Sequence, residues 1–359
     1  MFGQEKKTNE FRLLLSTYAN EDKSNGIYAY IFNSETGDFR SSGPPTRLLN
    51  SSYLAISDDN KNVYAVGEGG QGSVNAYAFN AATGALTLLN SVPSPGPCYV
   101  SVDAKKKFVF VGNYGGGSVL SIPLNADGSF RADVQTIKHE GSSVIKDRQD
   151  KPHVHAVVLS PDDRFLLVPD LGVDKVYQYR IDATSPQALS PAISPFTSVK
   201  PGSGPRHLTF HPNGKYAYLA LELVADVAVF GYKDGQLEEK QTVSMIEPGF
   251  QGKVSAADIH TSPDGKFLYV SNRGDANQIA IFSIGKDGRL KVVGHQSVLG
   301  KTPRNFAIDP SGNFLLAANQ NTNDIVIFKR DPKTGLLTDT GKKILVDKPV
   351  CLKFTEVEK

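Results

Sequence analysis

The chain contains little sulfur and no tryptophan. Its 359 residues include two Cys, two Met and no Trp. Two cysteines are too few for a disulfide framework or for a zinc knuckle. The absence of tryptophan excludes the Trp-Asp signature of WD40 repeats. We expect Cys98 and Cys351 to be free, buried thiols, because the repeat described below places them on innermost strands two units apart.

The chain also lacks a strong charge imbalance and long apolar runs. It has 39 Lys and Arg against 37 Asp and Glu, a formal net charge of +2. Near-neutrality argues against a nucleic-acid or anionic-membrane surface. No apolar segment approaches the roughly 18 residues of a membrane helix. We therefore expect a cytoplasmic protein, a monomer or weak dimer, with no nucleic-acid or membrane partner.

An internal repeat organises the sequence. A turn of the type Pro-Asp/Asn-Gly-Lys appears as "SPDDRF", "HPNGKY", "SPDGKF" and "DPSGNF", with degenerate copies "SDDNKN" and "DAKKKF". Successive copies lie about 50 residues apart. The anchor residues of these turns are Asp58, Ala104, Pro161, Pro212, Pro263 and Pro310. Each turn is flanked by runs of alternating apolar and polar residues, and two more runs follow, so each unit is predicted to be a four-stranded antiparallel sheet.

Sheets of this size repeated along one chain are typical of a β-propeller. Six units are complete. The N-terminus supplies three further strands, "FRLLLSTY", "GIYAYIFN" and "FRSSGP", and the C-terminus supplies one, "KPVCLKFTE". We expect these four strands to form a seventh, closing blade, which leaves no open sheet edge. The prediction is an all-β, seven-bladed propeller that forms a single domain over residues 1–359. The polar insertion "HEGSSVIKDRQDKPHVH" is interpreted as a loop over one face.

The repeat register places charged residues at one mouth of the propeller. The innermost strand begins six residues before each anchor, and the second strand ends ten residues after it. Because these strands are antiparallel, the start of one and the end of the other share an edge of the sheet. The polar residues at these positions include Glu68, His155, Arg206, Glu222, Arg273, Arg304 and Gln320. We expect them to converge on one cleft, where function is most often found.

At these residues the chain resembles a known family of seven-bladed lactonases. This family groups one type of 6-phosphogluconolactonase with fungal 3-carboxy-cis,cis-muconate lactonizing enzymes. The matching phrases span nearly the whole chain and include "NYGGGSV", "RQDKPHVHAVVLSPDDRFLLVPDLGVDKVYQY", "GPRHLTFHPNGKYAYLALEL" and "TPRNFAIDPSGNFLLAANQ". The family's proposed catalytic groups are a histidine, two arginines and a glutamate. The resemblance assigns these roles to His155, Arg206, Arg273 and Glu222.

The sequence departs from the family pattern at two positions. Tyr99 stands where relatives often have a histidine after "PC", and Gly67 stands where the first-blade phrase usually reads Asn-Glu. Neither position belongs to the four proposed catalytic groups. Both changes bear on substrate preference.

Lactone hydrolysis needs an activated water and stabilisation of the oxyanion. Glu222 and His155 are both candidates for the proton-transfer group. A carboxylate between Arg206 and Arg273 would have a lowered pKa, whereas an unperturbed histidine titrates near neutrality, so His155 is slightly favoured. The arginines suit an anionic substrate, because guanidinium binds phosphate or carboxylate bidentately.

Further substrate contacts are expected from residues at or near the mouth: Arg304, Glu68, Gln320, His153 and His207. Purely structural roles are the alternatives: an ion pair between Arg206 and Glu222, a hydrogen-bonded His155, and a solvated rim for Arg304 and Glu68. His260 lies out of phase with the mouth residues and is interpreted as structural.

We expect no cofactor and no catalytic metal, because a divalent cation beside several guanidinium groups is electrostatically unfavourable. The family resemblance implies a lactone hydrolase that acts on a small anionic lactone. Its expected substrate is 6-phospho-D-glucono-1,5-lactone, and the product 6-phosphogluconate belongs to the pentose phosphate pathway. The alternatives are a cycloisomerase (lactonizing lyase) of a carboxylated muconate, and a non-catalytic ligand-binding propeller.

Overall fold

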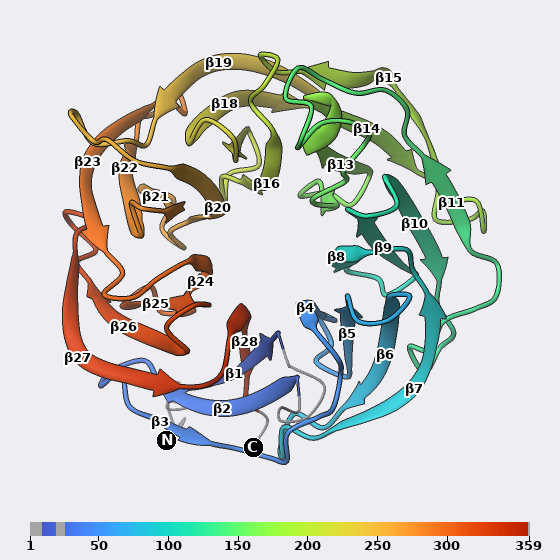
Figure 1. The fold of residues 1–359 in the computed structure, drawn as a ribbon. Coiled ribbons are helices and arrows are strands. Elements are labelled where there is room, and N and C mark those ends of the chain that lie inside the picture. The colour runs from blue at the N-terminus through green and yellow to red at the C-terminus, as the bar shows by residue number, and fades with distance from the viewer. Residues whose placement is uncertain (1–8, 19–25, 358–359) are drawn as a thin grey trace, which may run out of the picture.

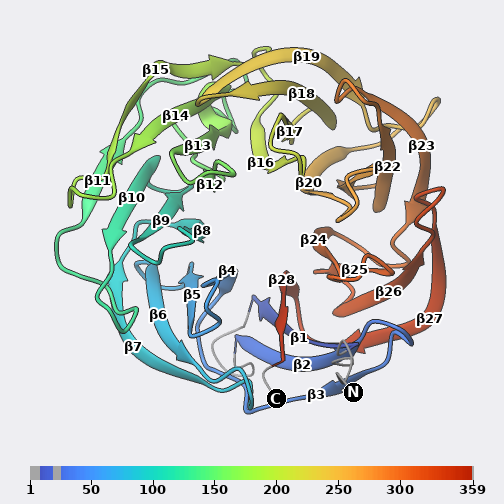
Figure 2. The same cartoon turned by 180° about the vertical axis from the view of Figure 1, so that it is seen from behind.

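The structure, a computed structural model, describes residues 9–18 and 26–357. Its strands form seven sheets, each of four antiparallel strands, arranged as blades around a common axis (Figure 1). The view from behind shows the same ring, with the first and last described strands in one blade (Figure 2). The predicted seven-bladed propeller is confirmed. No helix in the described part of the chain is long and apolar enough to cross a membrane.

The first three complete blades run from the inside outward in chain order. The first contains β4 (Ser51–Ile56), β5 (Asn62–Gly67), β6 (Ser73–Phe79) and β7 (Leu86–Pro93). The second contains β8 (Pro97–Val102), β9 (Phe108–Asn113), β10 (Ser118–Pro123) and β11 (Gln135–Lys138). The third contains β12 (Val158–Leu159), β13 (Phe165–Asp170), the 3-10 helix η1 (Leu171–Val173), β14 (Lys175–Ile181) and β15 (Leu189–Ser198).

The next three blades follow the same order. The fourth contains β16 (Pro205–Phe210), β17 (Tyr216–Leu221), β18 (Asp226–Lys233) and β19 (Gln236–Ser244). The fifth contains β20 (Val254–Thr261), β21 (Phe267–Gly274), β22 (Gln278–Ile284) and β23 (Leu290–Ser297). The sixth contains β24 (Pro303–Ile308), β25 (Phe314–Asn319), β26 (Asp324–Arg330) and β27 (Leu337–Leu345).

The seventh blade joins the two ends of the chain, as predicted. Its order from the axis outward is β28 (Pro349–Glu356), β1 (Glu10–Thr17), β2 (Ile27–Asn33) and β3 (Phe39–Ser41). β28 pairs antiparallel with β1, with Leu352 opposite Leu15 and Phe354 opposite Leu13. The last strand of the chain therefore closes the ring against the first, and the sheet edges that an open array would expose are paired.

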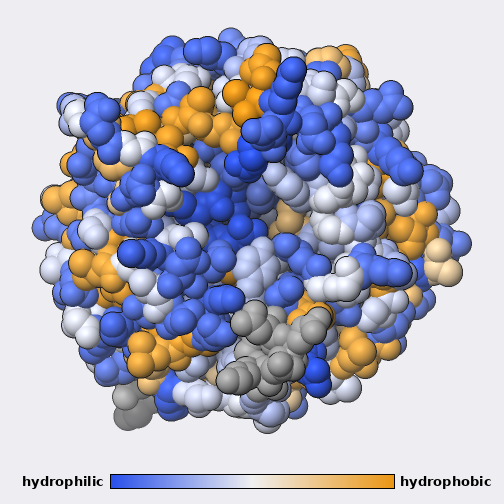
Figure 3. Space-filling model, viewed as in Figure 1, coloured by the Kyte–Doolittle hydropathy of each residue, from blue (hydrophilic) through white to orange (hydrophobic). Residues whose placement is uncertain are grey.

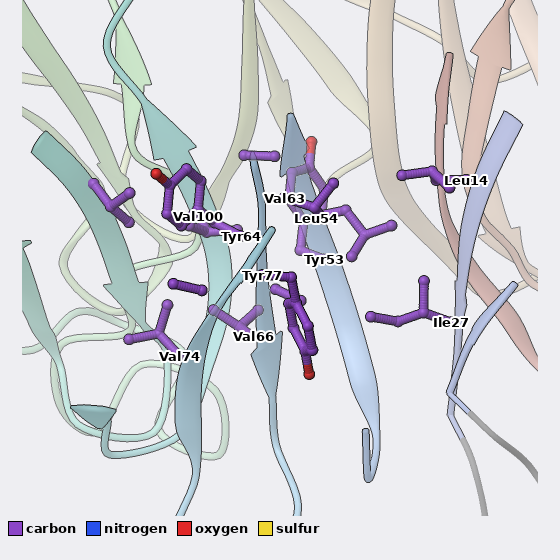
Figure 4. Packing of buried hydrophobic residues seen from close by; sticks show 14 of the residues in the cluster. Leu14, Ile27, Tyr53, Leu54, Val63, Tyr64, Val66, Val74, Tyr77 and Val100 are labelled. Carbon is purple, nitrogen blue, oxygen red and sulfur yellow. The ribbon is translucent and has the colours of Figure 1, made fainter. Parts of the chain in front are cut away.

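The hydrophobic core lies between neighbouring blades. One cluster joins the closing blade to the first two complete blades and includes Leu14, Tyr53, Leu54, Tyr64 and Val100 (Figure 4). The central strands are buried on both faces, which is why β5, β9 and β25 are almost continuously apolar rather than alternating. Each blade therefore depends on its neighbours for burial of its faces.

A repeated contact fastens each of three blades to the next. The hydroxyl of Tyr64 donates to the carbonyl of Gly128, 3.1 Å away, in the outer turn of the next blade. Tyr218 and Tyr269 make the same bond to glycine carbonyls, at 3.1 Å and 2.7 Å. Gly128 has a φ of 88°, a conformation that side chains strongly disfavour. Buried tyrosines thus satisfy their polar tips while their rings pack between sheets.

The insertion at residues 139–155 forms a loop on the third blade, as expected. The Ser143 hydroxyl donates to Asp174 Oδ2 over 2.6 Å, and the side-chain amide of Gln149 donates through Nε2 to the carbonyl of Leu171 over 2.9 Å. Gln149 is fully buried. These bonds fix the loop against η1 and determine where its remaining side chains lie.

Candidate active site

The inner strands break their regular pairing at the mouth. β4, β8, β16, β20 and β24 each shift register near their first residues, and β28 does so opposite the end of β1. A β-bulge leaves one or more residues out of the ladder and redirects their side chains. The residues left out include Ser52, Cys98, Arg206, Ala257, Arg304 and Val350. Five of these six residues lie six positions before an anchor, and Val350 is their counterpart in the closing strand; His155, six positions before Pro161, instead precedes β12. The bulges thus bring most of these positions to one mouth.

A cavity of about 390 Å³ lies at this mouth. One face of the ring is hollowed near its centre, and hydrophilic side chains surround the hollow (Figure 3). The cavity is lined by Tyr18, Glu68, Gly96, Cys98, Tyr114, Gly115, Arg148, His155, Glu222, Arg273 and Arg304. Seven blades supply a single wall, so residues far apart in sequence share one site.

Glu222 is the charged centre of this site. Its Oε2 atom lies 3.0 Å from Nε of Arg206 and 3.0 Å from a terminal nitrogen of Arg273. Its Oε1 atom accepts a 2.7 Å hydrogen bond from Arg148. Burial alone would raise the pKa of this carboxyl, but Arg273, Arg206 and Arg148 outweigh it and lower the pKa to about 2. The predicted lowering is confirmed, and Glu222 is a carboxylate at neutral pH.

Two of the arginines are fixed by the backbone of the fifth blade. Arg206 is almost fully buried and donates to the carbonyl of Ala257 over 2.6 Å. Arg273 donates to the Ser255 hydroxyl over 2.8 Å and to the carbonyl of Ala256 over 3.2 Å. Burial lowers the pKa of Arg273 to about 10, so it remains a cation at neutral pH. Both guanidinium groups are therefore held ready without substrate.

His155 lies between a thiol and the carboxylate. Its Nδ1 atom is 3.8 Å from Sγ of Cys98, and its Nε2 atom is 3.8 Å from Oε2 of Glu222. Burial, followed by Arg206, lowers its pKa well below 6.5. The expectation that this histidine titrates near neutrality is wrong, because the repeat register indicates its position but not its burial. His155 is neutral at pH 7.

A second group of polar side chains lies on the sixth, closing and first blades. The hydroxyl of Tyr18 donates to Oε1 of Glu68 over 2.9 Å. The guanidinium of Arg304 lies over the Tyr18 ring, 5.1 Å from its centroid. A cation in this arrangement is attracted to the face of the ring. Arg304 and Glu68 thus line the cavity, as the register predicts.

Three predicted contacts are not part of the cavity wall. His153 stacks on Tyr114 at 4.3 Å and bonds the carbonyl of Tyr114 through Nδ1 at 2.9 Å, so it supports a wall residue from behind. Gln320 donates its backbone N–H to the carbonyl of Thr302 and does not line the cavity. His207 lies deeper in the ring, where its ring meets that of His155 edge to face at 5.4 Å.

The layer beneath the cavity is organised by Asp258. Its carboxylate pairs with Nδ1 of His207 and with Nε2 of His260, both at 2.8 Å, and accepts a bond from Asn305. His260 is thus held by a partner below the mouth, consistent with a structural role. Tyr99 stacks on Tyr53 at 4.0 Å, in the same layer.

Sequence reasoning missed Arg148 and Tyr18 as site residues, and its register placed Tyr114 at the mouth without giving it a role. Arg148 lies in the insertion, which has no counterpart in other repeats and so no register. Tyr114 does lie ten residues after an anchor, and its position was available. Tyr18 follows β1, the second strand of the closing blade, and the register could have been extended to it by aligning β1 with the other second strands.

Within residues 9–18 and 26–357, no group of three or more His, Cys, Asp and Glu side chains is placed to hold a metal ion. Both cysteines are free and buried, as expected. Burial raises the pKa of Cys98 to about 12, so it is a thiol and not a thiolate. The described residues of this wall offer one imidazole, two carboxylates and three guanidinium groups; the fourth guanidinium, that of Arg206, is buried against Glu222 and does not line the cavity.

The sequence that forms this seven-bladed ring matches a known protein family. Residues 12–354 match the family described as "Lactonase, 7-bladed beta-propeller". The chain therefore belongs to this family of lactonases.

Several relatives have been named. The 6-phosphogluconolactonase of Bacillus subtilis is 37% identical over 338 residues, which are 92% of this chain and 95% of that protein. The 6-phosphogluconolactonase of Formosa agariphila is 36% identical over 342 residues, covering 93% and 97%. The solved structure of the periplasmic gluconolactonase of Pseudomonas aeruginosa is 38% identical and has a TM-score of 0.92, covering 97% and 100%.

Proposed function

We propose that the protein hydrolyses 6-phospho-D-glucono-1,5-lactone to 6-phosphogluconate at the cavity centred on Glu222. The observation that carries this proposal is the charge of the wall. Among the described residues, Arg148, Arg273 and Arg304 line the cavity and the buried Arg206 lies against Glu222, while the wall has two carboxylates, those of Glu68 and Glu222. A phosphate monoester carries nearly two negative charges at neutral pH and offers acceptors that match guanidinium donors.

His155 is the general base of this mechanism. Its neutral form has a free lone pair at pH 7, whereas the carboxylate of Glu222, with a pKa of about 2, is a poor proton acceptor. The thiol of Cys98 lies 3.4 Å from the carbonyl of Val154 and donates to it, which leaves a sulfur lone pair towards Nδ1 of His155. A proton on Nδ1 then leaves Nε2 free to accept one from water.

In the first step, water attacks the lactone carbonyl carbon and gives a proton to Nε2 of His155. The electrons of the carbonyl double bond move to its oxygen, and guanidinium groups stabilise that oxyanion. Glu222, 3.8 Å from Nε2, stabilises the imidazolium that forms.

In the second step, the tetrahedral intermediate collapses and the bond between the carbonyl carbon and the ring oxygen breaks. The leaving alkoxide takes the proton from His155, which returns to its neutral form. Bound substrate assists the first step, because its negative charge offsets the repulsion from Arg206 and raises the pKa of His155 towards an ordinary value. The arginines thus serve both substrate binding and proton transfer.

The test is turnover by the purified chain. Alkali uptake at constant pH should exceed the spontaneous rate with 6-phospho-D-glucono-1,5-lactone, and loss of ultraviolet absorbance should not occur with 3-carboxy-cis,cis-muconate. Turnover of the muconate instead would establish the cycloisomerase, which needs the same acid, base and anion contacts. Binding of 6-phosphogluconate without turnover of either compound would establish a ligand-binding propeller.

The wider setting belongs to the same proposal. We also propose that the protein acts in the pentose phosphate pathway and in the cytoplasm, and that residues 1–359 form one propeller domain. The periplasmic relative is named for a gluconolactone rather than a phosphogluconolactone. The remaining question is whether the cavity prefers the phosphorylated or the unphosphorylated lactone.

A further inference from the structure

We propose that Arg148 is the residue that recognises the phosphate of the substrate, and that it releases Glu222 in order to do so. This inference rests on the proposed function, since it names how the same cavity distinguishes a phosphorylated lactone from an unphosphorylated one. It assigns a role to the insertion loop at residues 139–155, which the repeat architecture does not require.

Arg148 is the most exposed of the three arginines around Glu222, and within the described residues no backbone carbonyl holds its guanidinium group. Its side chain is 41% exposed, against 13% for Arg273 and 1% for Arg206. Arg206 and Arg273 are also fixed by backbone carbonyls of the fifth blade. The contacts of Arg148 are the 2.7 Å bond to Glu222 and a long 3.4 Å contact to the hydroxyl of Tyr114.

The charge of Glu222 does not require Arg148. Two guanidinium groups, those of Arg206 and Arg273, remain within 3.0 Å of Oε2 when Arg148 leaves Oε1. Three arginines against one carboxylate leave an excess of two positive charges in this part of the wall. A phosphate dianion balances that excess, and the planar fork of an arginine binds it bidentately.

The side of the wall formed by the sixth, closing and first blades is less suited to a phosphate. Arg304 lies beside Glu68, whose carboxylate repels an anion there. The insertion loop, by contrast, adds a second cation to its side of the mouth. The ammonium of Lys151 is exposed and donates to the carbonyl of Gly115, a wall residue, over 3.1 Å.

Position also favours the loop side. The lactone carbonyl must lie near His155, which is buried. The phosphate is the most strongly hydrated part of the substrate, so its burial costs the most free energy and it is best bound near solvent. Arg148 lies between these two regions, because its guanidinium group contacts Glu222 while part of its side chain is exposed to solvent. The lactone ring would then lie between Arg148 and His155.

The experiment compares kcat/KM for 6-phospho-D-glucono-1,5-lactone and for D-glucono-1,5-lactone in the wild type, Arg148→Met and Arg148→Lys. Arg131→Met is the matched control, since Arg131 is an exposed arginine paired with the exposed Asp133, and neither residue lines the cavity. We expect Arg148→Met to lower kcat/KM for the phosphorylated lactone by roughly 10- to 100-fold, as loss of a charge-assisted bond predicts. The unphosphorylated lactone should change less than about threefold, and Arg148→Lys should recover part of the loss because it restores a positive charge.

An equal loss for both lactones would overturn the inference, because Arg148 would then act on the lactone or on Glu222. An unchanged ratio of the two kcat/KM values would overturn it as well. If the wild type hydrolyses neither lactone, the proposed function fails, and calorimetric binding of 6-phosphogluconate and of gluconate decides the role of Arg148 instead. A wild-type binding preference for 6-phosphogluconate over gluconate that Arg148→Met reduces by about tenfold or more supports the inference; an unchanged preference, or no preference at all, contradicts it.

Discussion

Nε2 of His155 lies 3.8 Å from Oε2 of Glu222, too far for a direct hydrogen bond and close enough for each charge to affect the other. The carboxylate is held by arginines, and the imidazole is kept neutral by burial and by Arg206. In this pair the proton acceptor is His155, and the negative charge that stabilises its protonated form belongs to a different residue, Glu222. The predictions below follow from that separation.

The first prediction concerns the pH dependence of catalysis. Because its pKa is lowered, His155 remains neutral at pH values at which a free histidine is already protonated, and it can still accept a proton there. The profile of kcat/KM reports the free enzyme and the free substrate. It should therefore carry no limb from His155 at pH 6.5, and the substrate phosphate, with a second pKa of about 6, should give the first fall on the acidic side. An acidic limb with its midpoint at pH 6.5 or above would show that His155 is not the base or is not buried as described.

The second prediction concerns stability. Glu222→Gln removes the charge that offsets buried Arg206 and half-buried Arg273, so it should lower the free energy of unfolding by roughly 3–5 kcal/mol. Arg148→Met is the control, because it removes an exposed partner and should cost less than about 1 kcal/mol. Urea denaturation followed by circular dichroism measures both values.

The same variant tests the pKa of Glu222. The pKa is lowered from 4.5 to about 2 in the folded state, so this carboxylate stabilises the fold above pH 4.5 and loses that contribution as the pH falls towards 2. The Glu222→Gln variant should lack this component of acid destabilisation. Identical stability of the two proteins at every pH would contradict the buried cluster.

The third prediction concerns Cys98. Burial raises its pKa to about 12, so it is not a nucleophile despite lying 3.8 Å from His155. Cys98→Ser keeps a hydrogen-bond acceptor beside Nδ1 and should retain kcat/KM within about threefold. A thiol reagent such as DTNB should label neither cysteine until the protein is unfolded. A loss of more than 100-fold in the serine variant would point to covalent catalysis instead.

The fourth prediction concerns closure of the ring. Deletion of residues 347–359 removes β28 and leaves β1 without its inner partner. The shortened chain should lose cooperative unfolding, because the closing blade packs against both of its neighbours. A synthetic peptide of residues 347–359 should restore the transition when added in excess. A shortened chain that melts within a few degrees of the full-length protein would show that closure contributes little.

The sequence predicts the architecture well because the architecture is periodic. One turn type, repeated, indicates the number of blades, the shared closing blade and the mouth where Arg206, Glu222 and Arg273 meet. Periodicity says nothing about a segment that occurs once, which is why Arg148 was missed. It also says nothing about burial, which is why the pKa of His155 was misjudged.

Phase along a strand is also a weak guide where the strand is bulged. Arg206 and His207 both fall in the bulge of β16, yet the first reaches Glu222 and the second reaches Asp258 beneath the cavity. Both were expected at the mouth. Which of two unpaired residues faces the cavity depends on packing against the next blade, and a pattern of apolar and polar letters does not contain that information.

The central claim is that His155 accepts the proton during hydrolysis of the lactone at this mouth. The most direct measurement is the rate of proton release from 6-phospho-D-glucono-1,5-lactone by His155→Ala, with His211→Ala as the matched control. His211 lies in an anchor turn and bonds the carbonyl of Gly265, outside the cavity wall. We predict a fall of about 100-fold or more in kcat for His155→Ala and no change for His211→Ala, with both variants folded. Wild-type turnover by the folded His155→Ala variant would contradict the account.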